Sequence, residues 1–407
     1  MSRRMSSPKA SISELGCSGV NKTLTEAVRT SKRRRKDSTP STALRCRSTS
    51  ASKHQSTSAA VAVNQSKHVM GHAAEGKGSG ASPGSSSSVV MVHVPSNFSF
   101  SQAACSYGYY LVPPNRWEPS KDVNDRDGGT FFRPLRFGER LANTAKCSIS
   151  QVAVPAAEEG GEKTAALRVD VAAQLTDPDM EDIVQQVTRM FQTTMDLQPW
   201  FRLSAEAEQR GYGRLFRSPT IFEDMVKSIT GCNMKFQGTI RMNKLLCEKF
   251  GRNGAFPTPH DLEGVQAEDL KDNAKVGYRA DRILRLAKSF RDGTVDPKWL
   301  GAGERTRDEV FKFVKNLYGF GDYAAGNVTM LLGFYEEVPL DSETVRHFKD
   351  FYGVTTKNVK EVAPKARQQY APYAPYQFLQ YWYEMIVWHE RKRGKEVHLW
   401  DASDFSW

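Results

Sequence analysis

The chain has 407 residues, enough for two or three domains with a sizeable core, and it carries 57 basic against 46 acidic side chains. Six cysteines are too few for a disulfide scaffold in a chain of this length. No C-x-x-C pair occurs and no cysteine follows Cys247, which excludes the usual zinc ribbon and a C-terminal iron–sulfur loop. No apolar run approaches the roughly 18–20 residues that span a bilayer, and no apolar stretch follows the charged first residues. We therefore expect no membrane partner and no secretory signal.

The excess positive charge lies at the N-terminus. The first 90 residues hold 15 of the basic side chains but only 4 of the acidic ones, so the rest of the chain is balanced. The first aromatic residue is Phe98, and a Ser- and Ala-rich segment without aromatic residues cannot bury enough surface to order itself. We predict a disordered tail over residues 1–92. Its basic cluster at 31–37 (SKRRRKD) favours the nucleus; a DNA-binding arm, a solvated linker and an organelle transit peptide are the alternatives.

Short aromatic or β-branched runs, separated by Pro and Gly turns, follow the tail. These runs are residues 92–100, 107–112, 130–137 and 167–171. They predict an antiparallel sheet. Asp177-Pro178 then predicts the start of a helix with an apolar stripe, so we expect a β domain with a packing helix over residues 93–205.

The pattern becomes helical from about residue 206 and remains so to 395. Thr220 is expected to begin one helix, with Glu223 placed for a capping box. Further helices are expected over residues 240–250, 278–290, 306–317, 324–333 and 376–393. Residues 396–407 are a C-terminal extension. The predicted fold class is α+β and mainly α, with an antiparallel sheet packed on a helical domain.

Two glycines separate two of these helices in the sequence Leu317 to Ala325 (LYGFGDYAA). The stretch Gly319-Phe320-Gly321 permits a hairpin whose consecutive amides face outward, and the next helix adds its partial positive charge. Such a turn can hold one DNA phosphate without any charged side chain. An ordinary turn between helices is the alternative.

A carboxylate follows the turn. Asp341 lies in residues 338–346 (VPLDSETVR), after a short loop with proline and at the start of a helix. The combination of hairpin and aspartate resembles the helix-hairpin-helix (HhH-GPD) DNA glycosylase superfamily. The resemblance implies a two-part helical domain and a catalytic Asp341, which would stabilise positive charge as a glycosidic bond breaks. A helix N-cap is the alternative role, and the two roles are compatible.

Other segments are similar to the 8-oxoguanine glycosylase branch of that superfamily. They are residues 227–251 (KSITGCNMKFQGTIRMNKLLCEKFG) and 276–280 (VGYRA). The resemblance, which covers about residues 93–393, implies that Asn233 fills the space left by an extruded base. It also implies that Tyr278 wedges into the duplex and that Arg279 binds the orphaned partner base. A helix start with a buried ring and a solvated charge is the alternative for the last two.

The chain departs from the bifunctional members at one position. They carry a lysine two residues after the second glycine of the turn, where this chain has Tyr323. A tyrosine cannot form a Schiff base with the sugar, so we expect a monofunctional enzyme. Lys235 and Lys315 are the candidates to substitute for the missing lysine.

The expected function is therefore that of a base excision repair DNA N-glycosylase. It would flip a damaged purine, oxidised or alkylated and opposite cytosine, and leave an abasic site. Phe378 and Trp382 are candidates to stack on the flipped base, with core packing as the alternative. A catalytically inactive lesion- or DNA-binding module is the competing hypothesis, and excision from thymine or uracil mismatches is a third.

The partners follow from the same resemblance. We expect a monomer that binds double-stranded damaged DNA, with downstream repair proteins as further partners. No cofactor is expected apart from a monovalent cation at the hairpin, which the resemblance implies.

Overall fold

The computed structural model describes residues 87–404 apart from 123, 155–163, 302, 304 and 357. The predicted tail over residues 1–92 lies outside this range except for its last six residues. Within the described range, no helix is both long and apolar enough to cross a membrane.

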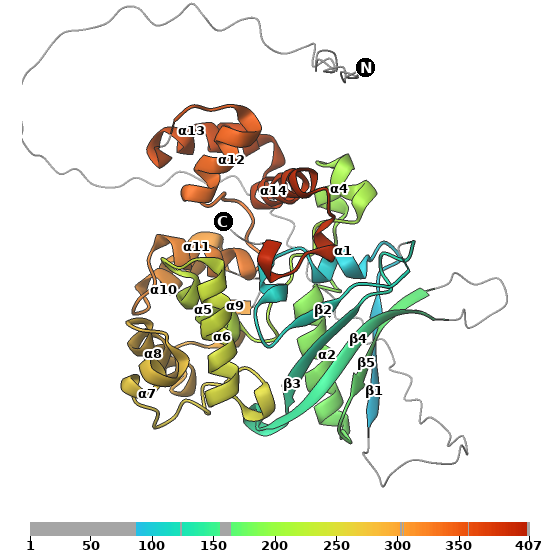
Figure 1. The fold of residues 1–407 in the computed structure, drawn as a ribbon, viewed down its shortest axis with the longest axis vertical. Coiled ribbons are helices and arrows are strands. Elements are labelled where there is room, and N and C mark those ends of the chain that lie inside the picture. The colour runs from blue at the N-terminus through green and yellow to red at the C-terminus, as the bar shows by residue number, and fades with distance from the viewer. Residues whose placement is uncertain are drawn as a thin grey trace, which may run out of the picture. The chain divides into compact units, whose positions relative to one another are not determined.

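The described part of the β domain contains one five-stranded antiparallel sheet with the strand order β1-β5-β4-β3-β2 (Figure 1). The strands are β1 (Ser88–Val94), β2 (Arg116–Glu118), β3 (Thr130–Phe137), β4 (Asn143–Val154) and β5 (Thr164–Val171). Side chains alternate between the two faces of each strand, and in β1 Val90, Val92 and Val94 are buried while Val89 and Met91 are exposed. The predicted antiparallel sheet is confirmed.

Three details of the sheet differ from the prediction. Strand β1 begins at Ser88, inside the predicted tail, because its alternating valines pair with β5 and bury one face without any aromatic residue. Strand β2, which is only three residues long, and strand β4, which is rich in small and polar residues, were not predicted. Residues 107–112, predicted as a strand, form the 3-10 helix η1 (Gly108–Leu111), in which the amides of Tyr110 and Val112 donate to the carbonyls of Tyr107 and Tyr109.

Helices make up most of the remaining chain. They are α1 (Phe100–Ala104), α2 (Asp177–Phe191), α3 (Gln198–Phe201), α4 (Ala205–Arg210), α5 (Ile221–Gly231), α6 (Phe236–Phe250), α7 (Ala267–Ala274), α8 (Arg279–Arg291), α9 (Pro297–Gly301), α10 (Arg307–Asn316), α11 (Asp322–Leu331), α12 (Ser342–Tyr352), α13 (Val359–Tyr370) and α14 (Gln377–Arg393). Helix α2 lies along the sheet (Figure 1). Its N-cap is Thr176 rather than Asp177, because the Thr176 hydroxyl and the Asp179 carboxylate form a reciprocal capping box.

Three hydrophobic cores hold the described residues together. The first joins the sheet to α1, α2 and one side of α14, the second lies among α5 to α11, and the third joins α12, α13 and the other side of α14. The C-terminal segment returns to the first core, where Val397 and Trp400 are buried. The α+β fold class with a two-part helical domain is confirmed.

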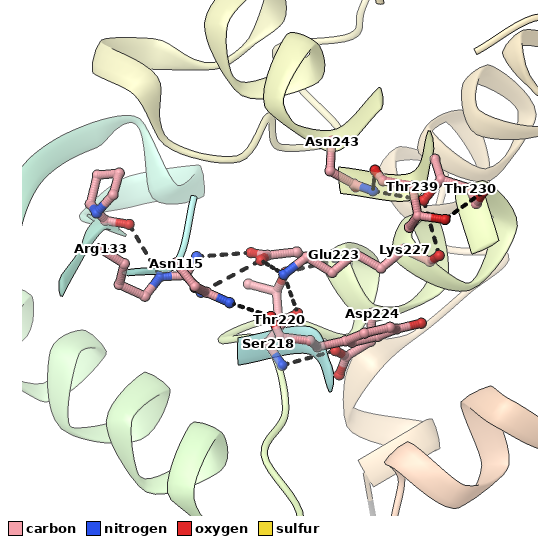
Figure 2. Close-up of polar contacts among 12 residues, drawn as sticks. Asn115, Arg133, Ser218, Thr220, Glu223, Asp224, Lys227, Thr230, Thr239 and Asn243 are labelled. Carbon is pink, nitrogen blue, oxygen red and sulfur yellow. Dashed lines mark hydrogen bonds and ion pairs between the residues drawn. The ribbon is translucent and has the colours of Figure 1, made fainter. Parts of the chain in front are cut away.

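A buried cluster of charges joins the sheet to α5 (Figure 2). The Glu223 carboxylate accepts from Arg133 of β3 at 3.0 Å and from Lys227 at 2.7 Å, and Lys227 is fully buried. Burial alone would raise the pKa of Glu223, but these two cations hold it below its ordinary value. The Thr220 hydroxyl caps the amide of Glu223 as predicted. The predicted return bond from Glu223 is absent among the described contacts because its carboxylate binds the two cations instead.

Candidate active site

A cleft of about 1050 Å³ opens where segments from several parts of the described chain meet. Its walls come from η1, the α5–α6 loop, the α10–α11 turn, the start of α12 and the middle of α14. Eight of the residues singled out from the sequence line it. They are Asn233, Lys235, Gly319, Phe320, Gly321, Tyr323, Asp341 and Trp382.

The turn between α10 and α11 forms a tight hairpin at the mouth of the cleft. The Phe320 amide donates to the Leu317 carbonyl at 3.1 Å, and Gly319 has a φ of 88°, a conformation that favours glycine. Phe320 anchors the turn in the second core. The N-cap of α11 is Gly321, and none of the side chains that the structure describes caps this helix. The first amides of α11 therefore stay available to an anion, as the glycine pattern predicts.

Asp341 combines two roles at the first turn of α12. Its Oδ1 accepts from the amides of Glu343 and Thr344, both at 3.0 Å, and so caps the helix. Its Oδ2 has no hydrogen-bond or ion-pair partner among the described residues. Because Asp341 lines the cleft, this second oxygen is available to a bound molecule while the first one fixes the position of the carboxylate.

Two further ionisable groups lie beside Asp341. The Tyr323 side chain is half exposed, but partial desolvation in the cleft and the negative charge of Asp341 raise its pKa to about 12, so its hydroxyl stays protonated at neutral pH. Burial also raises the pKa of Glu343, and Asp341 adds to this effect while the ion pair with Arg346 opposes it. The part of the cleft around Asp341 thus holds negative charge close to a neutral phenol.

The floor of the cleft is a polar network that the sequence did not predict. The Asn327 amide donates to the hydroxyls of Tyr109 at 3.0 Å and Ser228 at 2.9 Å, and its oxygen accepts from Tyr107 at 2.6 Å. All four residues line the cleft. One weak signal was available: Asn327 lies four residues after Tyr323, and this spacing puts both on one face of α11.

One wall of the cleft is aromatic. Trp382 lines it, contacts the ring of Tyr107 with centroids 5.2 Å apart, and donates from Nε1 to the Ser106 carbonyl at 2.7 Å. Phe378 is buried behind Trp382 and stacks on it, with centroids 5.9 Å apart. Trp382 therefore lines the cleft, whereas Phe378 packs behind it and does not line the cleft.

Of the residues predicted to enter the duplex, Asn233 lines the cleft, whereas Tyr278 and Arg279 contact residues that line it, Arg282 and Cys232. Asn233 is exposed and has a φ of 51°, in the left-handed region that Asn tolerates better than most residues. Tyr278 is half exposed and lies outside the cleft lining. Arg279 is buried, and its guanidinium donates to the carbonyls of Ile229 and Cys232 at the end of α5. The partner-base role of Arg279 stays a prediction, and it would require these bonds to open.

Arg282 is an alternative cation beside Tyr278, and it was missed in the sequence. It lines the cleft, lies over the ring of Tyr278 at 4.8 Å and packs against Gly319 of the hairpin. Arg285 lies over the exposed ring of Tyr318 at 4.2 Å. The spacing of Tyr278, Arg282 and Arg285 places them on one face of α8 and could have identified this surface.

The comparisons with known proteins identify the fold. No family model and no curated protein matches the sequence. Among solved structures, MBOgg1 in complex with a low-affinity DNA ligand is 19% identical, with a TM-score of 0.52 over 77% of this chain and 98% of that chain. The 3-methyladenine DNA glycosylase from Archaeoglobus fulgidus is 16% identical, with a TM-score of 0.50 over 74% of this chain and 99% of that chain.

The chain has the helix-hairpin-helix DNA glycosylase fold. At these identities the likeness establishes the architecture, and the activity has to be argued from the cleft. The hairpin that gives the fold its name is the α10–α11 turn, and Asp341 follows it by one helix and a loop.

The positions of lysines in this helix-hairpin-helix fold bear on the chemistry available. Among the described residues that line the cleft, Lys235 is the one lysine. Lys315 lies beside the hairpin, where it pairs with Asp322 at 2.5 Å. The described residues contain no group of three or more His, Cys, Asp or Glu side chains that could hold a metal ion.

Proposed function

We propose that this protein is a DNA N-glycosylase that flips a damaged purine out of duplex DNA and hydrolyses its glycosidic bond. The observation that carries the proposal is Asp341, whose Oδ1 is fixed as a helix cap while its Oδ2 is left for a bound molecule. A DNA-binding module without catalysis has no need for such a carboxylate beside the hairpin.

DNA binding would begin at the hairpin and at helix α8. The uncapped amides of α11 would hold one phosphate, and Arg282 and Arg285 would add charge on the same side. Extruding a nucleotide costs a few kcal/mol of stacking and pairing. Asn233 and the exposed ring of Tyr278 would offset this cost by occupying the vacated space.

The flipped base would lie against Trp382, with the sugar near Asp341. As the C1′–N bond breaks, its electron pair leaves with the base and positive charge develops on the sugar. The Asp341 carboxylate would stabilise that charge, which counts for more in a partly desolvated cleft than in water. It would also take a proton from the water that adds to C1′. The base, which carries the electron pair, takes up a proton through solvent, and Asp341 gives up the proton that it took from water. The free base and an abasic site are the products, and the carboxylate is ionised again.

The proposed enzyme is monofunctional. Tyr323 occupies the position of the lyase lysine, and its raised pKa keeps it a neutral phenol. A phenol cannot form the imine that strand cleavage by a lyase requires. Lys235 lines the cleft and is the residue whose amine would have to act if such cleavage were observed.

The substrate is proposed to be an oxidised or alkylated purine opposite cytosine, bound by a monomer. The support is the aromatic wall at Trp382 and the resemblance carried by Asn233, Tyr278 and Arg279. Nuclear location is proposed from the basic cluster at 31–37, which lies outside the described residues. A monovalent cation at the hairpin would bind backbone carbonyls such as that of Leu317, and no catalytic step depends on it.

A single-turnover assay tests the function. Duplexes would carry 8-oxoguanine opposite each base, alkylated purines, hypoxanthine, or uracil and thymine mismatches, and each would be read with and without alkali. Strand cleavage that appears only after alkali is the expected result. Intact DNA binding without base release from any duplex would favour the catalytically inactive module.

A further inference from the structure

We infer that the network of Tyr107, Tyr109, Ser228 and Asn327, hereafter the cleft floor, reads the extruded base and selects one whose edge donates hydrogen bonds. The inference rests on the proposed glycosylase function and goes further by assigning the chemistry of base selection to named side chains. Each side-chain hydrogen atom of the network has one acceptor, and this assignment fixes which atoms stay free.

The position of one hydrogen fixes the others. The Ser228 hydroxyl donates to the Asp224 carbonyl at 2.8 Å, one turn earlier in α5. Since a hydroxyl has one hydrogen, Ser228 can only accept from its other neighbours. Tyr109, at 3.2 Å, must then donate to Ser228. The hydroxyl of Tyr109 is left to accept.

The orientation of the Asn327 amide follows from the same count. Its two hydrogens match the two oxygens that must accept, those of Tyr109 and Ser228. The reverse orientation would place the amide oxygen 2.9 Å from a Ser228 oxygen that has no hydrogen to offer. The amide oxygen therefore points to Tyr107, whose hydroxyl donates to it at 2.6 Å.

Every side-chain hydrogen of the cleft floor is thus used within the protein. The side-chain oxygens of Tyr107, Tyr109 and Asn327 can each still accept a further hydrogen bond. Burial raises the pKa of both tyrosines well above the ordinary value, so they keep these hydrogens at neutral pH. Trp382 cannot add a donor, because its Nε1 hydrogen is bound to the Ser106 carbonyl.

A base edge that meets this surface must bring the hydrogens. Ring N–H groups and exocyclic amines would be bound, whereas an unprotonated ring nitrogen would face an oxygen and leave both unsatisfied. The substrate class is therefore a purine with an N–H donor on the edge that enters the cleft. The aromatic wall accepts any planar base, so selection depends on the cleft floor.

Two pairs of duplexes isolate this property. The first places 8-oxoguanine or 8-methoxyguanine opposite cytosine, and only the former has a hydrogen on N7. The second places adenine or unsubstituted purine opposite cytosine, and only the former has an exocyclic amine. Dissociation constants would be measured with Asp341→Asn, which retains a capping side chain, and base release with the unaltered chain.

Within at least one pair, the duplex whose base carries the donor should bind about tenfold more tightly than the other. This ratio of dissociation constants corresponds to one hydrogen bond of about 1.4 kcal/mol. Asn327→Leu, made in the Asp341→Asn protein, frees the Tyr107 hydrogen to point into the cleft and should reduce the ratio below about threefold. Tyr107→Phe should reduce it less. Tyr110→Phe is the matched control: its buried hydroxyl donates to the Val397 carbonyl away from the cleft, so the ratio should persist.

The possible outcomes separate the two proposals. Equal binding within both pairs, with normal DNA affinity, overturns base selection by the cleft floor. Base release without preference overturns it as well and leaves the glycosylase function standing. A binding preference that Asn327→Leu abolishes, without base release from any duplex by the unaltered chain, supports the cleft floor and removes the glycosylase function.

Discussion

The two glycines of the hairpin should respond in opposite ways to alanine. Gly319 has a φ of 88°, and an added Cβ would lie 2.5 Å from Cγ and Cδ of Arg282. Gly321 has a φ of −96°, which any residue adopts, and an added Cβ would meet no atom within 4 Å. The first glycine is therefore required by the fold, whereas the second leaves open space where a side chain would lie, at the N-cap of α11.

The expected magnitudes follow from this geometry. A left-handed conformation costs a residue with a Cβ about 1–2 kcal/mol, and Arg282 must also move, so Gly319→Ala should lower the thermal unfolding midpoint. Gly321→Ala restricts the unfolded chain and should be neutral or stabilising by about 0.4–1 kcal/mol. It should nevertheless weaken duplex binding by about tenfold, because the methyl group would keep a phosphate from the amides.

Differential scanning fluorimetry and fluorescence anisotropy with an undamaged duplex, at one fixed salt concentration, measure both effects. Each glycine variant serves as the control for the other. Duplex binding by Gly321→Ala equal to that of the unaltered chain would refute the phosphate contact at the hairpin. An unchanged melting midpoint for Gly319→Ala would refute the claim that the turn needs this glycine.

Three further predictions concern stability and chemistry. Glu223→Gln removes the carboxylate that pairs with two buried cations, Arg133 and Lys227, and should destabilise the protein by about 3–5 kcal/mol in thermal or denaturant unfolding. Glu248→Gln, which removes an exposed ion pair with Lys244, is the control and should cost under about 1 kcal/mol. The pKa of Glu223 is lowered in the fold, so its ionised form contributes its full stabilisation above about pH 4.3. The difference in the free energy of unfolding between the unaltered chain and Glu223→Gln should therefore shrink as the pH falls through the folded pKa. Lys235→Ala should release the base without cleaving the strand, as we expect of the unaltered chain. If the unaltered chain cleaved the strand without alkali and Lys235→Ala did not, the enzyme would not be monofunctional. Trp382→Ala should slow single-turnover base release by roughly 5- to 150-fold through lost stacking, with Trp382→Phe intermediate; equal rates would remove Trp382 from the base pocket.

Local sequence signals predicted the parts of the fold that local chemistry determines. The hydroxyl of Thr220 caps α5, as its position before an apolar periodic segment indicates. The glycine hairpin and the capping role of Asp341 also follow from residue type and spacing. In each case the hydrogen-bond partners lie within a few residues of one another.

The remaining features depend on contacts between distant parts of the chain. Tyr107 and Asn327 are 220 residues apart, so no spacing rule could have paired them, and the aromatic run around Tyr107 was instead predicted as a strand. Arg279 is buried because carbonyls at the end of α5 need a donor there. Glu223 was predicted as a capping residue, but it binds cations from another helical turn and from the sheet.

In the proposed mechanism, the Asp341 carboxylate drives glycosidic cleavage. The most direct test measures the single-turnover rate and the duplex dissociation constant of Asp341→Asn on the lesion that the unaltered chain releases fastest. Asn keeps the helix cap and removes the charge, so binding should stay within about threefold while the rate falls by about 100-fold or more. Asp350→Asn, an exposed carboxylate on the same helix, is the control. Equal rates for Asp341→Asn and the unaltered chain would contradict the mechanism and leave Asp341 as a helix cap.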